Sequence, residues 1–312
     1  MQRFHNILFV SQGLTDETEA LKQALSFARN NKAELHALIV CPEFPSEMSS
    51  YIAQYESSLI EALQKNIDST RQILGSSESD LPVEIKVESG STLGIRIIQT
   101  VIKNQHDLVI KQAELKEDNN GFKAIDLELL RKCPAPVWLC RPITKHRNQI
   151  KVAVAIDPEG VTAETEDLSV NLLKLSRALA DTCEGELNIL SCWEYEFEEH
   201  LRQNVWVKVE EQKLIKLVSD VKDRHRQALD NLIQSSNIKG KIKVHHTRGA
   251  PDQIIPEKIK ELNIDILLMG TVARTGISGF FIGNTAENVI QKLNCSLLAL
   301  KPAGFISPVK AY

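Results

Sequence analysis

The sequence predicts an α/β protein made of two tandem, doubly wound domains, each built on a five-stranded parallel sheet. Three observations lead to this prediction. Short apolar runs alternate with amphipathic helical segments along all 312 residues, both halves show these segments in the same order, and local matches recur at nearly constant offsets. Because single domains usually hold ~100–200 residues, the length also suits two of them.

The first half begins with an apolar run at 6–10, which indicates a buried strand. Apolar side chains then recur at helical spacing, at Ala20, Leu21, Ala24, Leu25 and Ala28. The same alternation continues to the end of this half. The predicted elements are strands 6–10, 33–40, 83–87, 107–110 and 136–140, and helices 16–29, 48–74, 93–102 and one around 127–130.

The second half repeats this order. The predicted elements are strands 151–156, 186–193, 242–246, 266–269 and 297–300, and helices 168–180, 212–233, 253–262 and one carrying Ala286, Val289, Ile290 and Leu293. Such alternation favours right-handed crossovers, with helices on both faces of each sheet. The polar segment 144–150 is the expected linker, which gives domains at 1–143 and 150–303.

Two local matches indicate that the halves arose by duplication. Residues 106–110 (HDLVI) match 264–268 (IDILL) at an offset of 158. Residues 130–142 match 290–302 at an offset of 160. Two independent matches at nearly equal offsets are unlike chance similarity.

Charge and composition argue against several classes of partner. The net charge of -4 is a poor match for nonspecific binding to nucleic acid or anionic membranes. No apolar run approaches the ~20 residues of a membrane span, and the first ten residues lead into a strand instead of a signal segment. The six cysteines are scattered without a CxxC pair, so we expect buried thiols and no disulfide framework. We therefore expect a cytoplasmic protein without nucleic-acid or membrane partners.

The segment 265–287 carries the strongest functional signal. Its apolar run ends at Gly270, which lacks a Cβ and lets the backbone turn sharply or approach a ligand. Gly283 then precedes Asn284 and Thr285, residue types that favour helix N-caps. A helix N-terminus that faces a glycine loop suits an anion, so we interpret the segment as a phosphate cradle. The competing interpretation is a surface loop whose glycines only shape turns.

Both halves resemble universal stress protein domains, and the whole chain resembles the tandem, E-type members of that family. The resemblance rests on the repeated five-strand pattern, on LRKCPAPVWLC at 130–140 and on MGTVARTGISGFFIGNTAENV at 269–289. It implies Rossmann-like, adenine-nucleotide alpha-hydrolase-like domains that bind ATP or another adenine nucleotide, with Mg²⁺ as a companion of the phosphates. It also implies that the domains pair through their last strands, and it leaves a homodimer open.

The resemblance implies specific phosphate contacts. Members that bind ATP share a glycine, two residues, a glycine, nine residues, a glycine and then serine or threonine. Gly270 and Gly283 match the outer glycines, whereas Ala273 replaces the middle one. Asn284 replaces the hydroxyl residue, and Thr285 follows one step later. If position 273 needs a positive φ, the alanine methyl costs about 1 kcal/mol, whereas Asn284 keeps groups that can cap and donate.

The resemblance also implies contacts with the nucleoside. Asp157 follows strand 151–156 and would lie near the adenine and ribose, although it equally suits a turn residue of the DPEG sequence. The backbone at Cys192 would meet the adenine edge. Met269 and Val272 would line the pocket beside the phosphates. Arg274 suits either a phosphate contact or a solvated loop cation.

The first half lacks this motif. Residues 111–113 (KQA) stand where the second half has MGT, and 123–125 (KAI) stand where it has GNT. Gln12 lies near the position of Asp157, and Asp126 would add negative charge where phosphate should bind. We therefore expect a structural first domain that does not bind ATP in the family manner.

The leading interpretation is a stress-response protein that binds an adenine nucleotide in its second domain. The alternative is a nucleotide-free scaffold or interaction protein with a lapsed site. An ATP-using transferase of the same superclass would need signatures that this chain lacks. No catalytic base is assigned, although Asp157 and Glu287 are nearby carboxylates. His245 and His246 are adjacent on a strand and would point to opposite faces, so no metal site is predicted.

Overall fold

The computed structural model describes residues 4–13, 16–78, 80–114, 119–160, 162–203, 209–271 and 282–311. The first half contains β1 (Asn6–Ser11), α1 (Thr18–Asn31), β2 (Glu34–Cys41), a 3₁₀ helix (Ser46–Tyr51), α2 (Ile52–Leu74), β3 (Val83–Ser89), α3 (Leu93–Asn104), β4 (Leu108–Gln112), α4 (Ala124–Lys132) and β5 (Val137–Cys140). A short 3₁₀ turn (Arg147–Gln149) follows in the predicted linker.

The second half repeats this order with one additional helix. It contains β6 (Val152–Ala155), α5 (Ala163–Thr182), β7 (Leu187–Trp193), α6 (Glu198–Gln203), α7 (Glu211–Ser236), β8 (Ile242–Arg248), α8 (Pro251–Leu262), β9 (Ile266–Gly270), α9 (Asn284–Lys292) and β10 (Ser296–Leu300). The α/β fold class is confirmed, and each predicted strand is found. The predicted helix 48–74 is shorter, because Met48 leaves helical geometry (φ -113°, ψ 20°) and α2 begins at Ile52. The short helix α6 was not predicted.

All the described strands form a single sheet in the order β3-β2-β1-β4-β5-β10-β9-β6-β7-β8. Within each half the strands are parallel, and the strand order reverses between β1 and β4 and between β6 and β9. The halves meet where β5 and β10 pair antiparallel, with Leu297 opposite Leu139. This contact confirms the predicted pairing through the last strands. Ligands of doubly wound sheets bind beyond the carboxyl ends of the strands at such reversals, so each half offers one candidate edge.

Two apolar cores sandwich the sheet, because successive strand side chains point to opposite faces. Phe9 belongs to the core on one face, which also contains side chains of α1, α2, α5 and α7. Its neighbour Val10 belongs to the core on the other face, which contains side chains of α3, α4, α8 and α9. Both cores continue across the junction, since Trp138 and Leu298 belong to the first core and Leu139 and Leu297 to the second.

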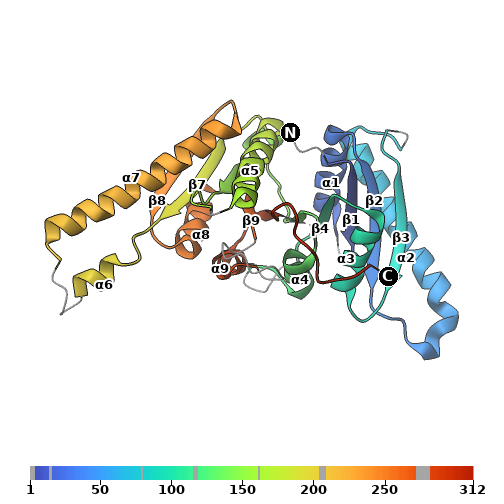
Figure 1. The fold of residues 1–312 in the computed structure, drawn as a ribbon. Helices are drawn as coiled ribbons and strands as arrows, with labels where there is room; N and C mark the ends of the chain where they lie inside the picture. Colours follow the sequence, from blue (N-terminus) through green and yellow to red (C-terminus); the bar gives the residue numbers. More distant parts are fainter. Residues whose placement is uncertain are drawn as a thin grey trace.

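Arg141, which follows β5, fastens the two halves together. Its backbone N–H donates to the Ser296 hydroxyl at 2.9 Å. Its guanidinium donates to the carbonyls of Asn119 at 2.8 Å in the first half and of Leu293 at 3.1 Å in the second half. Beyond β10 the chain returns over the first half, where the Ser307 hydroxyl donates to the Lys132 carbonyl at 2.7 Å and the C-terminus ends near α3 (Figure 1). Hydrogen bonds from Arg141 and Ser307 therefore join the two halves in addition to the pairing of β5 with β10.

Candidate functional site

The carboxyl edge of the second half gathers the predicted site residues from three neighbouring strands and one helix. β6 pairs with both β7 and β9, so the ends of these strands lie side by side. Asp157 follows β6, Cys192 lies near the end of β7, and Gly270 ends β9. Gly283 and Asn284 lie where α9 begins. Val272, Ala273 and Arg274 fall outside the described residues.

Gly270 brings β9 into close contact with helix α5. A Cβ at this position would lie 3.0 Å from Leu168 Cδ2, which is tighter than ordinary packing. The next residue, Thr271, is fully buried, and its backbone N–H donates to the Leu300 carbonyl at 3.1 Å. Glycine therefore lets helix α5 approach the strand end without displacing the Leu168 side chain, in addition to any approach by a ligand.

The start of α9 is tied directly to the end of β9. The backbone N–H of Gly283 donates to the Thr271 carbonyl at 3.0 Å. Gly283 is the N-cap residue, with φ -62° and ψ 141°, and no side chain caps this helix end. The prediction of Asn284 as the cap is therefore wrong: Asn284 is the first helical residue, and both it and Thr285 are exposed. Among the described residues, no side chain accepts from the first-turn N–H groups, as an anion-binding helix end requires.

Asp157 takes part in a turn beside a cavity. Its Oδ1 accepts a hydrogen bond from the Glu159 backbone N–H at 3.1 Å, which supports the turn interpretation without excluding a ligand contact. A cavity of about 280 Å³ opens beside it between α5 and α7, and Ser169 and Asn231 are among its lining residues. Neither Gly270 nor Gly283 lines this cavity. The described residues therefore hold two neighbouring features, a helix N-terminus and a cavity at Asp157, and not one closed pocket.

Cys192 and Met269 are held by packing. Burial, reinforced by Glu194, raises the pKa of the Cys192 thiol to about 12, so the thiol stays neutral. The second strand can therefore offer a nucleotide its backbone groups and a neutral thiol. Met269 is 5% exposed and belongs to the core under α8 and α9.

A sequence profile of the universal stress protein family matches residues 3–141 and 151–301. The universal stress protein E of Photorhabdus laumondii subsp. laumondii is 30% identical over 322 residues, which covers 100% of this chain and 99% of that protein. The chain belongs to the universal stress protein family. The duplication of the fold makes it a tandem universal stress protein.

Other relatives agree with this assignment. The universal stress protein E of Escherichia coli K12 is 28% identical over 319 residues, covering 99% of this chain and 98% of that protein. A protein of unknown function from Pseudomonas aeruginosa PAO1 superposes with a TM-score of 0.68 at 23% identity, over 96% of this chain and 93% of that one. A universal stress protein from Archaeoglobus fulgidus superposes with a TM-score of 0.63 at 16% identity, over 95% and 97% of the two chains. These structures support the two-domain fold.

In the first half of this universal stress protein, a buried ion pair occupies the corresponding edge. Lys111, at the position of Met269, points its Nζ at Asp126 Oδ1 (2.9 Å) and Glu114 Oε1 (3.0 Å). The other carboxylate oxygen of Asp126 accepts from the Glu114 backbone N–H at 2.7 Å. Burial alone would lower the pKa of Lys111, but the carboxylates of Asp126 and Glu114 outweigh it and raise that pKa. The ammonium is therefore charged and held by the protein itself.

Further polar groups extend this cluster toward the position of Asp157. The Gln12 amide donates to Glu114 Oε1 at 2.7 Å, and its backbone N–H donates to Glu17 Oε1 at 3.3 Å. Glu17 is 4% exposed, and burial raises its pKa. Sequence reasoning missed Glu17 and Glu114 and treated Lys111 only as a lost motif residue. A lysine inside the apolar run of β4 was the available signal, because a buried lysine needs a partner.

Glu287 faces the junction between the halves. Its carboxylate forms an ion pair with Arg131 of α4 in the first half. The carboxylate that the sequence placed near the phosphates is thus engaged in a contact between α4 and α9. Within the described ranges, no group of three or more His, Cys, Asp or Glu residues is arranged to hold a metal ion. Nor does any helix in those ranges have the length and apolar character to cross a membrane.

The adjacent histidines of β8 point to opposite faces, as predicted. His245 Nε2 lies 3.0 Å from Asn188 Oδ1 of β7. His246 Nε2 lies 3.0 Å from His225 Nδ1 of α7. Each ring therefore has its own partner, and the two rings share no ligand.

Proposed function

We propose that this tandem universal stress protein acts in the cytoplasmic stress response and binds ATP or another adenine nucleotide at the carboxyl edge of its second half. The observation that carries the proposal is the link between β9 and α9. Gly283 is hydrogen-bonded to Thr271 and is the N-cap residue of a helix end that no side chain of the described ranges caps. This edge also lies at a reversal of strand order, where doubly wound sheets bind their ligands. All six cysteines are free thiols, as a reducing compartment favours.

The proposed binding mode divides the nucleotide between the two features of the edge. The backbone N–H groups of Gly270, of residues 272–273 and of Asn284 and Thr285 hold the phosphates, and the positive end of the α9 dipole supports their charge. The N–H groups of Thr271 and Gly283 instead join β9 to β10 and to the start of α9. Asp157 and the backbone at Cys192 hold the adenosine end, beside the 280 Å³ cavity. Mg²⁺ would take its ligands chiefly from the phosphates and water, since it commonly binds through few protein groups.

The first half is proposed to bind no nucleotide, because its edge already holds the charges that a ligand would supply. Lys111 occupies the edge as a cation, and Asp126 would repel a phosphate at the start of α4. Displacing this ion pair would leave buried charges without partners, which is costly. We therefore expect one nucleotide per chain.

Titration of the full chain with labelled ATP tests the proposal. Gly283→Asp keeps a residue that suits an N-cap but adds a carboxylate at the phosphate position. It should weaken binding by ~100-fold or more, because like charges at a binding interface cost several kcal/mol. Gly283→Ser caps the helix without charge and controls for the added side chain. Lys123→Asp places the same carboxylate at the equivalent N-cap of the first half, with a charge change of two units instead of one, and should leave ATP binding unchanged.

The outcomes separate the nucleotide proposal from the scaffold alternative. Absence of saturable ATP binding by the unmodified chain would overturn the proposal and favour a nucleotide-free scaffold. Equal weakening by Gly283→Asp and Lys123→Asp would place the nucleotide elsewhere or in both halves. Circular dichroism of each variant checks that the fold is retained.

A further inference from the structure

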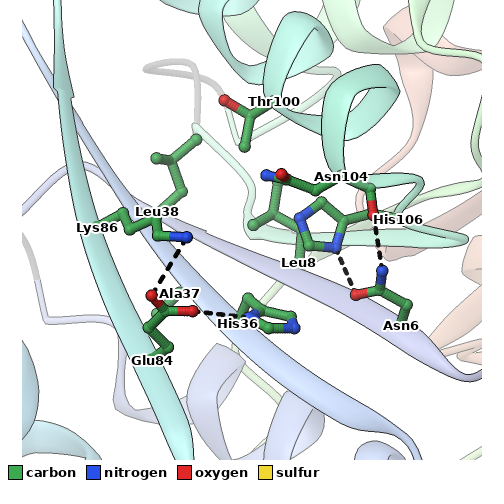
Figure 2. Close-up of a pocket in the computed structure, with 10 residues that line it drawn as sticks. All are labelled: Asn6, Leu8, His36, Ala37, Leu38, Glu84, Lys86, Thr100, Asn104 and His106. Atoms are coloured by element: carbon green, nitrogen blue, oxygen red, sulfur yellow. Dashed lines mark hydrogen bonds and ion pairs between the residues drawn. The ribbon is translucent and has the colours of Figure 1, made fainter.

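A pocket of about 200 Å³ lies in the first half at the amino ends of the strands, the edge opposite the proposed nucleotide site. We call it the amino-edge pocket. It lies between the sheet and the last turns of α3, and its floor is apolar, formed by Leu8, Ala37 and Leu38. Its polar lining comes from four strands or strand ends and from α3, as Figure 2 shows: Asn6, His36, Glu84, Lys86, Thr100 and His106.

Asn6 fixes the tautomer of His106. The side-chain nitrogen of Asn6 donates to the carbonyls of Asn104 at 2.9 Å and Gln105 at 3.4 Å, so its oxygen is the atom that faces the imidazole. His106 Nδ1, at 2.7 Å from that oxygen, must then carry the proton. The other ring nitrogen, Nε2, therefore presents a lone pair, and it has no partner among the described residues.

His106 keeps this neutral form across the physiological pH range. The residue is 6% exposed, and burial, followed by the neighbouring His36, lowers its pKa to about 4. The unpaired Nε2 is thus a permanent hydrogen-bond acceptor on a well-buried side chain. Nε2 is not one of the fully buried side-chain atoms that lack a partner, so a ligand that donates a hydrogen bond can reach it from the pocket.

The other groups around the pocket are also mainly acceptors. The Thr100 hydroxyl donates its proton to the Arg96 carbonyl at 3.0 Å, so the oxygen keeps only lone pairs for a ligand. Glu84 adds a carboxylate, which lies 3.6 Å from His36 Nδ1 and 3.2 Å from the Lys86 ammonium. A ligand that matches these groups must donate several hydrogen bonds.

The local charge favours a cation. The lining holds one carboxylate, Glu84, and one ammonium, Lys86. Glu34 lies outside the lining, at 3.7 Å from His36 Nε2. The pocket also lies beside the C-terminal end of α3, whose dipole favours positive charge. Because Glu84 and Lys86 are paired and balance each other, Glu34 and the helix end tip the local charge toward a cation.

The equivalent place in the second half has the opposite character. In the strand pairing, Asn188 stands in the position of His36 and Lys243 in that of Glu84. Ile264 replaces His106 two residues before its strand. The depression there has three lysines, Lys145, Lys151 and Lys243, against one carboxylate, Glu186, and its other polar side chains are amides. The two imidazoles and the balanced charge therefore distinguish the pocket of the first half from the lysine-rich depression of the second half.

We propose that the amino-edge pocket binds a small aliphatic primary amine in its ammonium form. One N–H donates to His106 Nε2, the remaining N–H groups meet Thr100 Oγ1 and the Glu84 carboxylate, and the short stem lies on Leu8, Ala37 and Leu38. The pocket volume corresponds to roughly six water-sized groups, which suits an amine of a few carbons. Binding leaves the proposed nucleotide edge untouched, because the two sites lie at opposite ends of the strands.

Imidazole NMR of the full chain at pH 7.5 tests this site. Ethylammonium chloride should shift the His106 Nε2 resonance saturably. Tetramethylammonium carries the same charge without N–H groups, and ethylene glycol donates hydrogen bonds without charge, so neither should reproduce the shift. Glu84→Gln should weaken ethylammonium binding about twofold to fivefold, the loss expected for a partly exposed ion pair. Lys243→Gln, at the equivalent position of β8, should leave the affinity unchanged.

Several results would overturn the proposal. A resonance that does not respond to ethylammonium would show that the pocket takes no amine. An equal response to ethylene glycol would make it a site for neutral donors. A response to Zn²⁺ without one to ethylammonium would make it a metal site. Thr100→Val serves as a second variant at a helix position, and unchanged affinity in both Thr100→Val and Glu84→Gln would contradict the assigned contacts.

Discussion

The two carboxyl edges of the sheet occupy equivalent places in a duplicated fold and hold different chemistry. In the second half, Met269 and Ala286 are apolar, and Gly283 opens the start of α9. In the first half, Lys111 and Asp126 stand at the positions of Met269 and Ala286 and form a buried ion pair. The comparison teaches that a copy of a binding fold can satisfy its own edge with internal charges. Both halves have the same strand order and the same pattern of helices. In the first half, however, the ion pair occupies the place at which we propose that the second half binds an anion.

The largest expected effect comes from breaking the ion pair of the first half. Asp126→Ala leaves the Lys111 ammonium buried without its closest partner, and should lower the free energy of unfolding by about 3–5 kcal/mol. The double variant Lys111→Met with Asp126→Ala installs the residues of the second half and removes both charges. Its cost should be much smaller, because replacing a buried ion pair by apolar groups is often close to neutral. Urea unfolding followed by circular dichroism measures both.

This double-mutant comparison has a clear contrary result. If Asp126→Ala lowered the free energy of unfolding by less than about 1 kcal/mol, the loss would be that of a solvent-exposed ion pair. Lys111 would then not be buried away from water. A double variant as unstable as the single one would show that the polar cluster also supports the surrounding loop. Asn284→Ala, on the exposed start of α9, provides a second-half reference with little expected effect.

The second-largest expected effect is a loss of stability in acid, caused by His106 of the first half. The unfolded chain binds a proton on this histidine near its ordinary pKa of 6.5, whereas the folded chain does so only near pH 4. The free energy of unfolding therefore falls as the pH drops from about 6.5 to about 4, by on the order of 2–3 kcal/mol. His106→Asn keeps a donor for Asn6 and lacks the titrating ring. Its unfolding free energy should fall less over this interval, and an equal fall would assign the acid sensitivity to other groups.

Sequence reasoning predicted the scaffold because scaffold signals are local. Runs such as 266–269 and 108–110 are short, apolar and bounded by polar residues or glycine, a pattern typical of buried parallel strands. The pairing of β5 with β10 followed from the family resemblance. The N-cap of α9 was assigned one residue too late, because glycine and asparagine both suit that position and the exit of the loop decides between them.

The clusters could not be predicted, because they combine residues that only the fold brings together. Lys111 and Asp126 are 15 residues apart and meet only when β4 packs against α4. His36, Glu84 and His106 lie on separate strands or strand ends and show no spacing in the sequence. The bond between Asn6 and His106 spans 100 residues. Long-range polar contacts of this kind depend on strand order and register, and composition does not encode them.

The glycine pattern of the second half allows a finer test of the comparison. Ala273 stands where members that bind ATP have a glycine, so Ala273→Gly should tighten ATP binding about fivefold, equivalent to about 1 kcal/mol, if that position adopts a positive φ. Gln112→Gly, at the first-half equivalent of Gly270, should create no ATP binding, because the ion pair remains. Calorimetric titration measures both variants. Tighter binding in Gln112→Gly would show that the first-half edge is open to a nucleotide.

The smallest expected effect concerns Glu287, which the sequence placed near the phosphates and the structure pairs with Arg131 across the junction. Because both side chains are partly exposed, Glu287→Gln should lower the free energy of unfolding by only about 0.2–1 kcal/mol. Arg131→Gln should cost a similar amount, and the two losses should not add, since they remove the same ion pair. ATP affinity should stay unchanged in both variants. A large loss of affinity in Glu287→Gln alone would return this carboxylate to the nucleotide edge, whereas an equal loss in both would show that the α4 and α9 contact transmits nucleotide binding to the first half.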